Sequence, residues 1–248
     1  MTDVADSPWS PWSPPRHLVS TLEGPDGALD LMLYQPEGEA PVGGWPCLVV
    51  LDGERYFGAA AGAVASLSRR SAKTGVTPMV VAAIAHRTDA GAVEDQRARD
   101  FTHHPCSEPG WSRPAGGGAA FCRRLVDQVL PRIARTTTVD PRRMALFGHS
   151  LAGLFVLETL ETSPDMFARW ISLSPSLWWR TPDPAIARPS LLIGCGEAET
   201  RRDMRRRIEQ WAAVKQDQGA SFRLAPGADH GSTPFALLPD VLRHAGAA

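Results

Sequence analysis

The sequence has 248 residues, a length typical of one mixed α/β domain. Hydrophobic residues make up 43% and charged residues 21%, which excludes a largely disordered or membrane-embedded chain. The formal net charge of −1 excludes a broad basic surface for nucleic acid or an anionic membrane, so we expect a small-molecule partner. Lys73 and Lys215 are the only lysines, so nearly all basic residues are arginines.

The N-terminal sequence has neither the basic segment nor the apolar segment of a secretory signal, and no apolar run is long enough to span a membrane. The four cysteines are far apart and form no C-x-x-C pair, so we expect reduced thiols. These features predict a cytoplasmic protein.

The predicted elements begin after residues 1–15, an irregular arm rich in proline, serine and tryptophan. Strands predicted at 17–22 and 28–34 flank a Gly-Pro-Asp-Gly turn and indicate an antiparallel hairpin. Two apolar runs at 47–51 and 79–85 have the composition of strands buried on both faces. A helix-compatible segment lies between these runs, so a parallel sheet is predicted.

In the second half of the chain, predicted strands and helices continue to alternate after an irregular insertion over residues 86–118. Residues 16–248 are therefore predicted to form one doubly wound α/β domain, with a mostly parallel sheet and helices on both faces. The remaining helices are predicted at 121–135, 151–160, 204–214 and 237–244, and the remaining strands at 144–147, 170–173, 190–193 and 221–224.

A serine lies where a predicted strand turns directly into a predicted helix, in the sequence Gly-His-Ser-Leu-Ala-Gly over residues 148–153. A sharp strand-to-helix turn exposes the serine hydroxyl above the sheet, and small neighbours allow the backbone to turn. Ala152 stands where the strict pattern has glycine, with Gly153 following. Ser150 is the candidate nucleophile.

A serine nucleophile needs a histidine base and an acid that orients the histidine, in the chain order Ser, acid, His for this type of fold. His230 follows the strand predicted at 221–224 and is preferred to His244, which lies in the last helix. Glu197 and Glu199 both follow the strand predicted at 190–193. Glu197 is the first choice for the acid and Glu199 the second.

The tetrahedral intermediate of acyl transfer needs hydrogen-bond donors for its oxyanion. The amide of Leu151, directly after the candidate nucleophile and at a helix N-terminus, is one expected donor. The second is expected in the turn at Gly53 and Glu54, after an early central strand.

Basic and aromatic residues near this predicted centre are candidates for substrate binding. Arg55, Arg97 and Arg99 could clamp an anionic group, and a structural role in ion pairs is an equal alternative. Trp178 and Trp179 could stack on an aromatic ligand or line an apolar pocket without specificity. No metal or cofactor is expected, because the spacing of the histidines and the cysteine at 103–106 fits no zinc pattern.

The chain resembles a serine esterase family of α/β-hydrolases, and within it the siderophore esterases that open enterobactin and salmochelin trilactones. The resemblance implies an α/β-hydrolase fold, with Ser150 as nucleophile, His230 as base, Glu197 as acid and oxyanion amides at Leu151 and at residues 53–54. It rests on Leu-Asp-Gly at 51–53, Arg-Ala-Arg-Asp-Phe-Thr at 97–102, Gly-Gly-Gly-Ala-Ala-Phe at 116–121, the serine turn at 148–156, Ser-Pro-Ser-Leu-Trp-Trp at 174–179 and His-Gly at 230–231.

The expected function is hydrolysis of ester or lactone bonds in a siderophore, including a ferric siderophore, which would aid intracellular iron release. The alternative is an esterase, thioesterase or acyltransferase that acts on a small acyl or acylated-carbohydrate metabolite.

Overall fold

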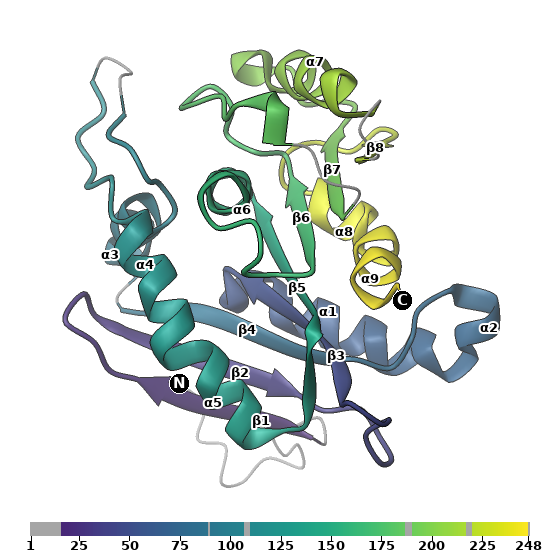
Figure 1. Ribbon diagram of the computed structural model, residues 1–248. Coiled ribbons are helices and arrows are strands. Elements are labelled where there is room, and N and C mark those ends of the chain that lie inside the picture. The colour runs from purple at the N-terminus through teal and green to yellow at the C-terminus, as the bar shows by residue number, and fades with distance from the viewer. Residues whose placement is uncertain (1–15, 89, 107–109, 187–189, 217–219, 248) are drawn as a thin grey trace, which may run out of the picture.

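Eight strands form one sheet in the computed structural model, which describes residues 16–247 apart from 89, 107–109, 187–189 and 217–219 (Figure 1). The irregular arm predicted over residues 1–15 lies outside the described residues. The order across the sheet is β1-β2-β4-β3-β5-β6-β7-β8. The strands are β1 (His17–Leu22), β2 (Ala28–Tyr34), β3 (Trp45–Leu51), β4 (Val80–Arg87), β5 (Val139–His149), β6 (Arg169–Leu173), β7 (Leu191–Gly196) and β8 (Ser221–Ala225).

The first two strands form the predicted antiparallel hairpin, whose turn is closed by a 3.1 Å hydrogen bond from the Gly27 amide to the Gly24 carbonyl. β2 also pairs antiparallel with β4, and every later pairing in the sheet is parallel. The predicted α/β class, with a mostly parallel sheet and an N-terminal hairpin, is confirmed.

Helices cover both faces of the sheet and bury two apolar clusters (Figure 1). The two faces of β5 show why: Met144 and Leu146 pack into one cluster, while Ala145 and Phe147 pack into the other. One face carries α1 (Gly53–Leu67) and α9 (Leu238–Gly246); the other carries α3 (Ala90–Asp100), α4 (Gly118–Arg124), α5 (Leu130–Thr136), α6 (Leu151–Thr162) and α7 (Met204–Gln216); α2 (Ser71–Thr74) and α8 (Thr233–Ala236) are single turns.

The predicted helix over 121–135 is a single helical stretch in which a π-helical turn, Leu125–Val129, joins α4 to α5. Pro131 follows this turn and has no amide hydrogen for the usual bond four residues back. The amide of Leu130 instead bonds the carbonyl of Leu125, five residues back.

The prediction of an irregular insertion over residues 86–118 is wrong in part, because α3 occupies Ala90–Asp100. This helix has almost no apolar stripe, so hydrophobic periodicity could not reveal it. It is held by buried polar contacts, described below, and by Ala98, which is packed in the core.

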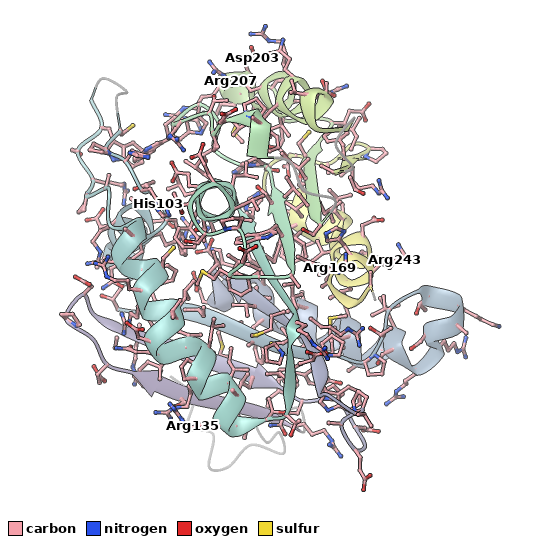
Figure 2. The ribbon with its side chains drawn as sticks, viewed as in Figure 1. His103, Arg135, Arg169, Asp203, Arg207 and Arg243 are labelled. Carbon is pink, nitrogen blue, oxygen red and sulfur yellow. The ribbon has the colours of Figure 1, made fainter. Side chains whose placement is uncertain are left out.

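Charged side chains such as Arg135, Asp203 and Arg207 point outward from the helices (Figure 2). Within the described residues, no helix is both long enough and apolar enough to cross a bilayer.

Candidate active site

Ser150 lies at the sharp turn between β5 and α6 and has a positive φ, with φ 61° and ψ −118°. Positive φ is uncommon for a residue other than glycine and is typical of strained turns at functional sites. The Ser150 amide donates a 3.0 Å hydrogen bond to the Leu173 carbonyl at the end of β6. The turn is therefore fixed to the neighbouring strand, and the hydroxyl is presented above the carboxyl edge of the sheet.

Two glycines make this turn possible. A Cβ atom at Gly148 would lie 2.2 Å from the Ala152 carbonyl oxygen, and one at Gly153 would lie 2.8 Å from the Leu173 carbonyl oxygen. Both contacts are with backbone, so larger residues would displace the turn. Ala152, which stands in the first turn of α6, is buried in the core.

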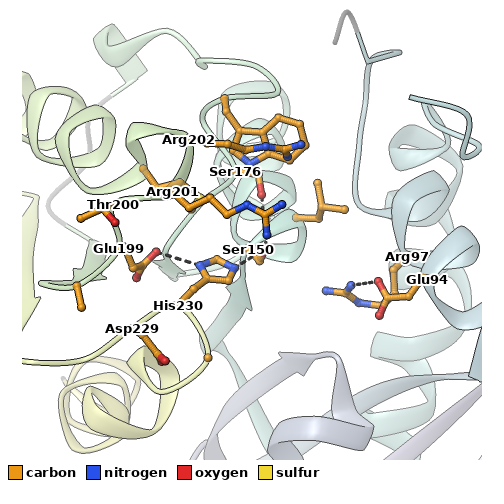
Figure 3. A pocket seen from close by; sticks show the side chains of 15 residues that line it. Glu94, Arg97, Ser150, Ser176, Glu199, Thr200, Arg201, Arg202, Asp229 and His230 are labelled. Atoms are coloured by element: carbon orange, nitrogen blue, oxygen red, sulfur yellow. Dashed lines mark hydrogen bonds and ion pairs between the residues drawn. The ribbon is translucent and has the colours of Figure 1, made fainter. Parts of the chain in front are cut away.

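A hydrogen-bonded relay joins three side chains from different loops (Figure 3). Nε2 of His230 lies 3.1 Å from Oγ of Ser150, and Nδ1 of His230 lies 2.9 Å from Oε2 of Glu199. Because a carboxylate only accepts, Nδ1 carries the hydrogen and Nε2 is free to accept the serine proton. His230 follows β8 and Glu199 follows β7, so parallel strands bring all three residues to one edge of the sheet.

Glu199 is buried and fully hydrogen-bonded. Its Oε1 atom accepts hydrogen bonds from Oγ of Ser174 at 2.5 Å, the amide of Gly196 at 2.7 Å and Oγ1 of Thr233 at 2.9 Å. Burial raises the pKa of the carboxyl, but the bonds from His230, Ser174 and Gly196 outweigh it and hold the pKa below its usual value. Glu199 is therefore ionised at neutral pH.

Glu199, and not Glu197, contacts His230, which reverses the order of preference from the sequence. The Glu197 side chain is exposed and accepts a 2.9 Å hydrogen bond from the Gly227 amide. β7 ends at Gly196, and in the turn that follows the Glu199 amide donates a hydrogen bond to the Gly196 carbonyl. This turn brings residue 199 back to the end of the strand. The position of each glutamate in this turn, and not the number of residues that separate it from β7, determines which carboxylate faces His230.

His149, which sequence reasoning did not single out, packs against His230 with ring centroids 4.5 Å apart. Nδ1 of His149 lies 2.9 Å from the hydroxyl of Tyr56 on α1. Burial, followed by repulsion from a charged His230, lowers the pKa of His149 to about 3. At neutral pH the His230 ring therefore rests on an uncharged imidazole.

The relay opens into a cavity of about 500 Å³, within the size range of small-molecule sites. Ser150, His230 and Glu199 line it, as does Leu151, whose amide lies at the N-terminus of α6. Gly53 and Glu54 start α1, and amides in the first turn of a helix have no partner within the helix. The residues expected to bind an oxyanion are thus at two helix N-termini, and of them Leu151 lines the cavity whereas Gly53 and Glu54 are not among its lining residues.

Arg97 lines the cavity, but its guanidinium is already occupied. Nε and Nη2 bind the two carboxylate oxygens of Asp52 at 2.5 and 2.8 Å, and Nη1 binds Glu94 at 2.8 Å. Asp52 is completely buried and has φ 55°. The pair ties α3 to the turn before α1, and so joins the segment Arg-Ala-Arg-Asp-Phe-Thr to the segment Leu-Asp-Gly.

Arg55 and Arg99 are not among the residues that line the cavity. Arg55 pairs with Glu94, and Arg99 binds the carboxylate of its neighbour Asp100 and the carbonyl of Asp26. These contacts lie within the protein, as expected for the structural role that was the alternative to substrate binding. The three arginines therefore do not form the predicted clamp for an anionic group.

Comparisons with known proteins show to which family the chain belongs. The family model described as "Putative esterase" matches residues 24–216. Ferri-bacillibactin esterase BesA of Bacillus subtilis is 34% identical over 242 residues, which cover 87% of this chain and 83% of that protein. The chain belongs to this esterase family. It is an ester hydrolase.

Solved structures show the same fold for this esterase. The BES protein from Bacillus cereus superposes with a TM-score of 0.86 at 22% identity, covering 97% of this chain and 99% of that one. Siderophore hydrolase EstB from Aspergillus nidulans superposes with a TM-score of 0.77 at 23% identity, covering 96% and 97%.

The two tryptophans predicted to contact the substrate have different positions in the structure. Trp178 lines the cavity, whereas Trp179 is buried and makes an edge-to-face contact with Trp111, with centroids 4.7 Å apart. The indole N–H of Trp179 bonds the His104 carbonyl at 3.2 Å. Trp179 therefore packs a loop beside the site and does not reach the cavity.

The cavity residues that were not expected from the sequence include Ser176, Arg201 and Arg202. Oγ of Ser176 lies 3.5 Å from Oγ of Ser150, and Arg201 and Arg202 line the wall near Trp178. The two arginines belong to an arginine-rich stretch typical of a solvated surface. They face the cavity because of the turn that follows β7, which is apparent only in the structure.

Proposed function

We propose that this esterase hydrolyses ester bonds of a siderophore through a Ser150–His230–Glu199 triad. The observation that carries the proposal is the relay itself, with 3.1 Å between Ser150 and His230 and 2.9 Å between His230 and Glu199. The nucleophile, the base and the acid are thus joined in sequence at hydrogen-bonding distances.

In the acylation step, Oγ of Ser150 attacks the ester carbonyl while Nε2 of His230 takes the hydroxyl proton. The ionised carboxylate of Glu199 holds the Nδ1 hydrogen and stabilises the imidazolium that forms. The Leu151 amide, with an amide at Gly53 or Glu54, binds the oxyanion. Collapse of the intermediate breaks the bond to the alcohol, which leaves with the proton from His230.

In the deacylation step, water attacks the acyl-serine carbonyl and His230 takes its proton. The second intermediate releases the acid and returns the proton to Ser150. The overall reaction consumes one water for each ester bond broken.

The substrate class is supported by BesA, a relative whose name describes a ferri-bacillibactin esterase and which aligns over most of both chains. The cavity of about 500 Å³ is large enough for a bulky chelating group beside the ester. The cytoplasmic location stays a prediction of the sequence.

A mass-spectrometric panel tests this proposal with ferric and iron-free ester siderophores, acyl-thioesters and acylated sugars. We expect ester cleavage of the siderophores by the wild-type protein and none by Ser150→Ala. Cleavage confined to thioesters or acylated sugars would contradict the substrate class. Full activity of Ser150→Ala would contradict the triad.

A further inference from the structure

The plane of the His230 ring is not fixed by the relay itself. The relay joins Nδ1 of His230 to Glu199 and Nε2 to Ser150. Two hydrogen bonds in the plane of a ring leave the ring able to tilt about the line that joins them. The His230 side chain is 44% exposed, so burial does not prevent this tilt. A contact on the face of the ring is needed to hold its plane.

His149 makes this contact. Its ring centroid lies 4.5 Å from that of His230, with 41° between the two planes. His149 ends β5, directly before Ser150 in the chain, and is only 4% exposed. The strand that positions the nucleophile therefore also positions the surface on which the base packs.

Tyr56 fixes the His149 ring in turn. Its hydroxyl lies 2.9 Å from Nδ1 of His149, and its ring makes edge contacts with His149 and Phe147. Tyr56 is itself buried near the start of α1, where its amide donates a 3.2 Å hydrogen bond to the Asp52 carbonyl. Contacts between buried groups thus lead from the start of α1 through His149 to His230.

The surroundings of His149 favour an uncharged ring. Burial lowers its pKa, repulsion from His230 and Arg97 lowers it further, and the carboxylate of Glu199 opposes this only in part. Burial also raises the pKa of Tyr56 to about 12, so its hydroxyl stays protonated. Protonation of His149 would place a hydrogen on Nε2, which is buried and has no hydrogen-bond partner within the described residues.

We infer that His149 and Tyr56 are positioning residues for the base of the esterase. The His149 ring, fixed by the Tyr56 hydroxyl, holds the plane of His230 and packs against the imidazolium that forms during acyl transfer. This inference rests on the proposed function, because it needs His230 as the base. Neither His149 nor Tyr56 gains or loses a proton in the reaction. An uncharged aromatic face attracts a cation, so the contact strengthens when His230 is protonated.

The pH profile of kcat/KM for a nitrophenyl ester tests the contact in His149→Leu, which removes the aromatic face. We expect kcat/KM to fall about tenfold. The acid limb of the profile reports the pKa of His230 in the free enzyme and should move down by about half to one pH unit, the size of one cation–π contact. Because the position of this limb does not depend on the amount of folded protein, a merely structural role would leave it unmoved. An unmoved limb would overturn the inference.

A double variant, Tyr56→Phe with His149→Phe, tests whether the aromatic face is what matters. It removes both polar partners of the buried hydrogen bond together and keeps a ring against His230. The acid limb should return to its wild-type position, and most of the kcat/KM lost in His149→Leu should be recovered. A limb as low as that of His149→Leu would overturn the inference.

The two tyrosines of the chain provide a matched pair of substitutions. Tyr56→Phe leaves Nδ1 of His149 without its hydrogen bond and should slow the labelling of Ser150 by a fluorophosphonate probe about threefold to tenfold. Tyr34 packs against His17, with ring centroids 5.5 Å apart, and is not among the residues that line the cavity. Tyr34→Phe should therefore label at the wild-type rate. Equal labelling rates in the two variants would overturn the inference.

His230→Ala separates this inference from the proposed function. Full activity of His230→Ala would reject the triad, and the inference with it. Loss of activity in His230→Ala together with an unmoved acid limb in His149→Leu would reject only the roles of His149 and Tyr56.

Discussion

Oε2 of Glu199 lies 2.9 Å from Nδ1 of His230, while Glu197, two residues earlier, bonds the Gly227 amide instead. One carboxylate is buried and the other is exposed. The turn that follows β7 thus places two glutamates in different environments, so that one bonds the histidine and the other bonds a backbone amide.

The two carboxylates provide a matched pair of substitutions. Glu199→Gln should lower kcat by about 10²–10⁴-fold, because the amide no longer stabilises the imidazolium or fixes its tautomer. Glu197→Gln should change kcat little, since its side chain does not touch His230. Steady-state hydrolysis of a nitrophenyl ester measures both, and a larger loss in Glu197→Gln would contradict the assignment.

Acid should destabilise the wild-type protein through Glu199. Its pKa is lowered in the folded state, so its stabilising contribution is complete above the ordinary glutamate pKa of about 4.3 and is lost as the pH falls through the folded value. The difference in unfolding free energy between the wild type and Glu199→Gln should be constant near pH 7 and should shrink below about pH 4. Urea unfolding at several pH values measures it, and a difference independent of pH would contradict the ionised network.

His149 should produce a separate acid dependence. Its folded pKa of about 3 lies below the unfolded value of about 6.5, so the unfolded chain binds a proton that the folded protein excludes between these values. Stability should therefore be complete above about pH 6.5 and should fall, by an amount on the order of a few kcal/mol, as the pH drops toward 3.

His149→Gln should remove the part of this acid dependence that lies between about pH 6.5 and 4, because glutamine does not titrate. His104→Gln, at an exposed position, is the control and should retain it. Urea unfolding of both variants across this range provides the measurement. An unchanged pH profile in His149→Gln would show that the buried imidazole does not exclude the proton.

The ion pair between Asp52 and Arg97 should be important for stability. Arg97→Met leaves the buried carboxylate unpaired and should cost about 3–5 kcal/mol of unfolding free energy. Asp52→Asn combined with Arg97→Met should recover part of the loss, because no buried charge then remains. Arg113→Met breaks an exposed pair with Asp95 and should cost less than about 1 kcal/mol. Equal losses in the two single variants would contradict the structural role.

Gly148 and Gly62 should differ in how well they tolerate substitution by alanine. Gly148→Ala should lower stability by about 1–3 kcal/mol or more, because its Cβ would meet the Ala152 carbonyl at 2.2 Å. Gly62→Ala lies on the exposed side of α1, with nothing within 4 Å of its Cβ, and should raise stability by about 0.5–1 kcal/mol. Thermal unfolding of both variants tests the contrast.

Much of the fold could be predicted because its strands are short apolar runs. β3, β4, β6 and β7 are buried on both faces, and this burial demands a continuous apolar sequence that is easy to recognise. α3 could not be predicted in the same way. It is held by the Arg97–Asp52 pair and by the bond between Asp100 and His86, neither of which leaves a periodic pattern.

The positions of Ser150 and His230 follow from strand ends, which local patterns reveal. The choice between Glu197 and Glu199 depends on a turn closed by backbone hydrogen bonds, and no side-chain pattern records it. Arg201 and Arg202 belong to an arginine-rich stretch before a polar helix, a pattern typical of a solvated surface. Their place in the cavity depends on the left-handed backbone at residues 202–203, which the sequence does not signal.

The most direct test of the triad is mass-spectrometric mapping of a fluorophosphonate probe on the intact protein. One probe should attach per chain, on the peptide that contains Ser150, and labelling should be absent in Ser150→Ala and much slower in Glu199→Gln than in Glu197→Gln. Attachment to another residue, or unchanged labelling of Ser150→Ala, would contradict Ser150 as the nucleophile.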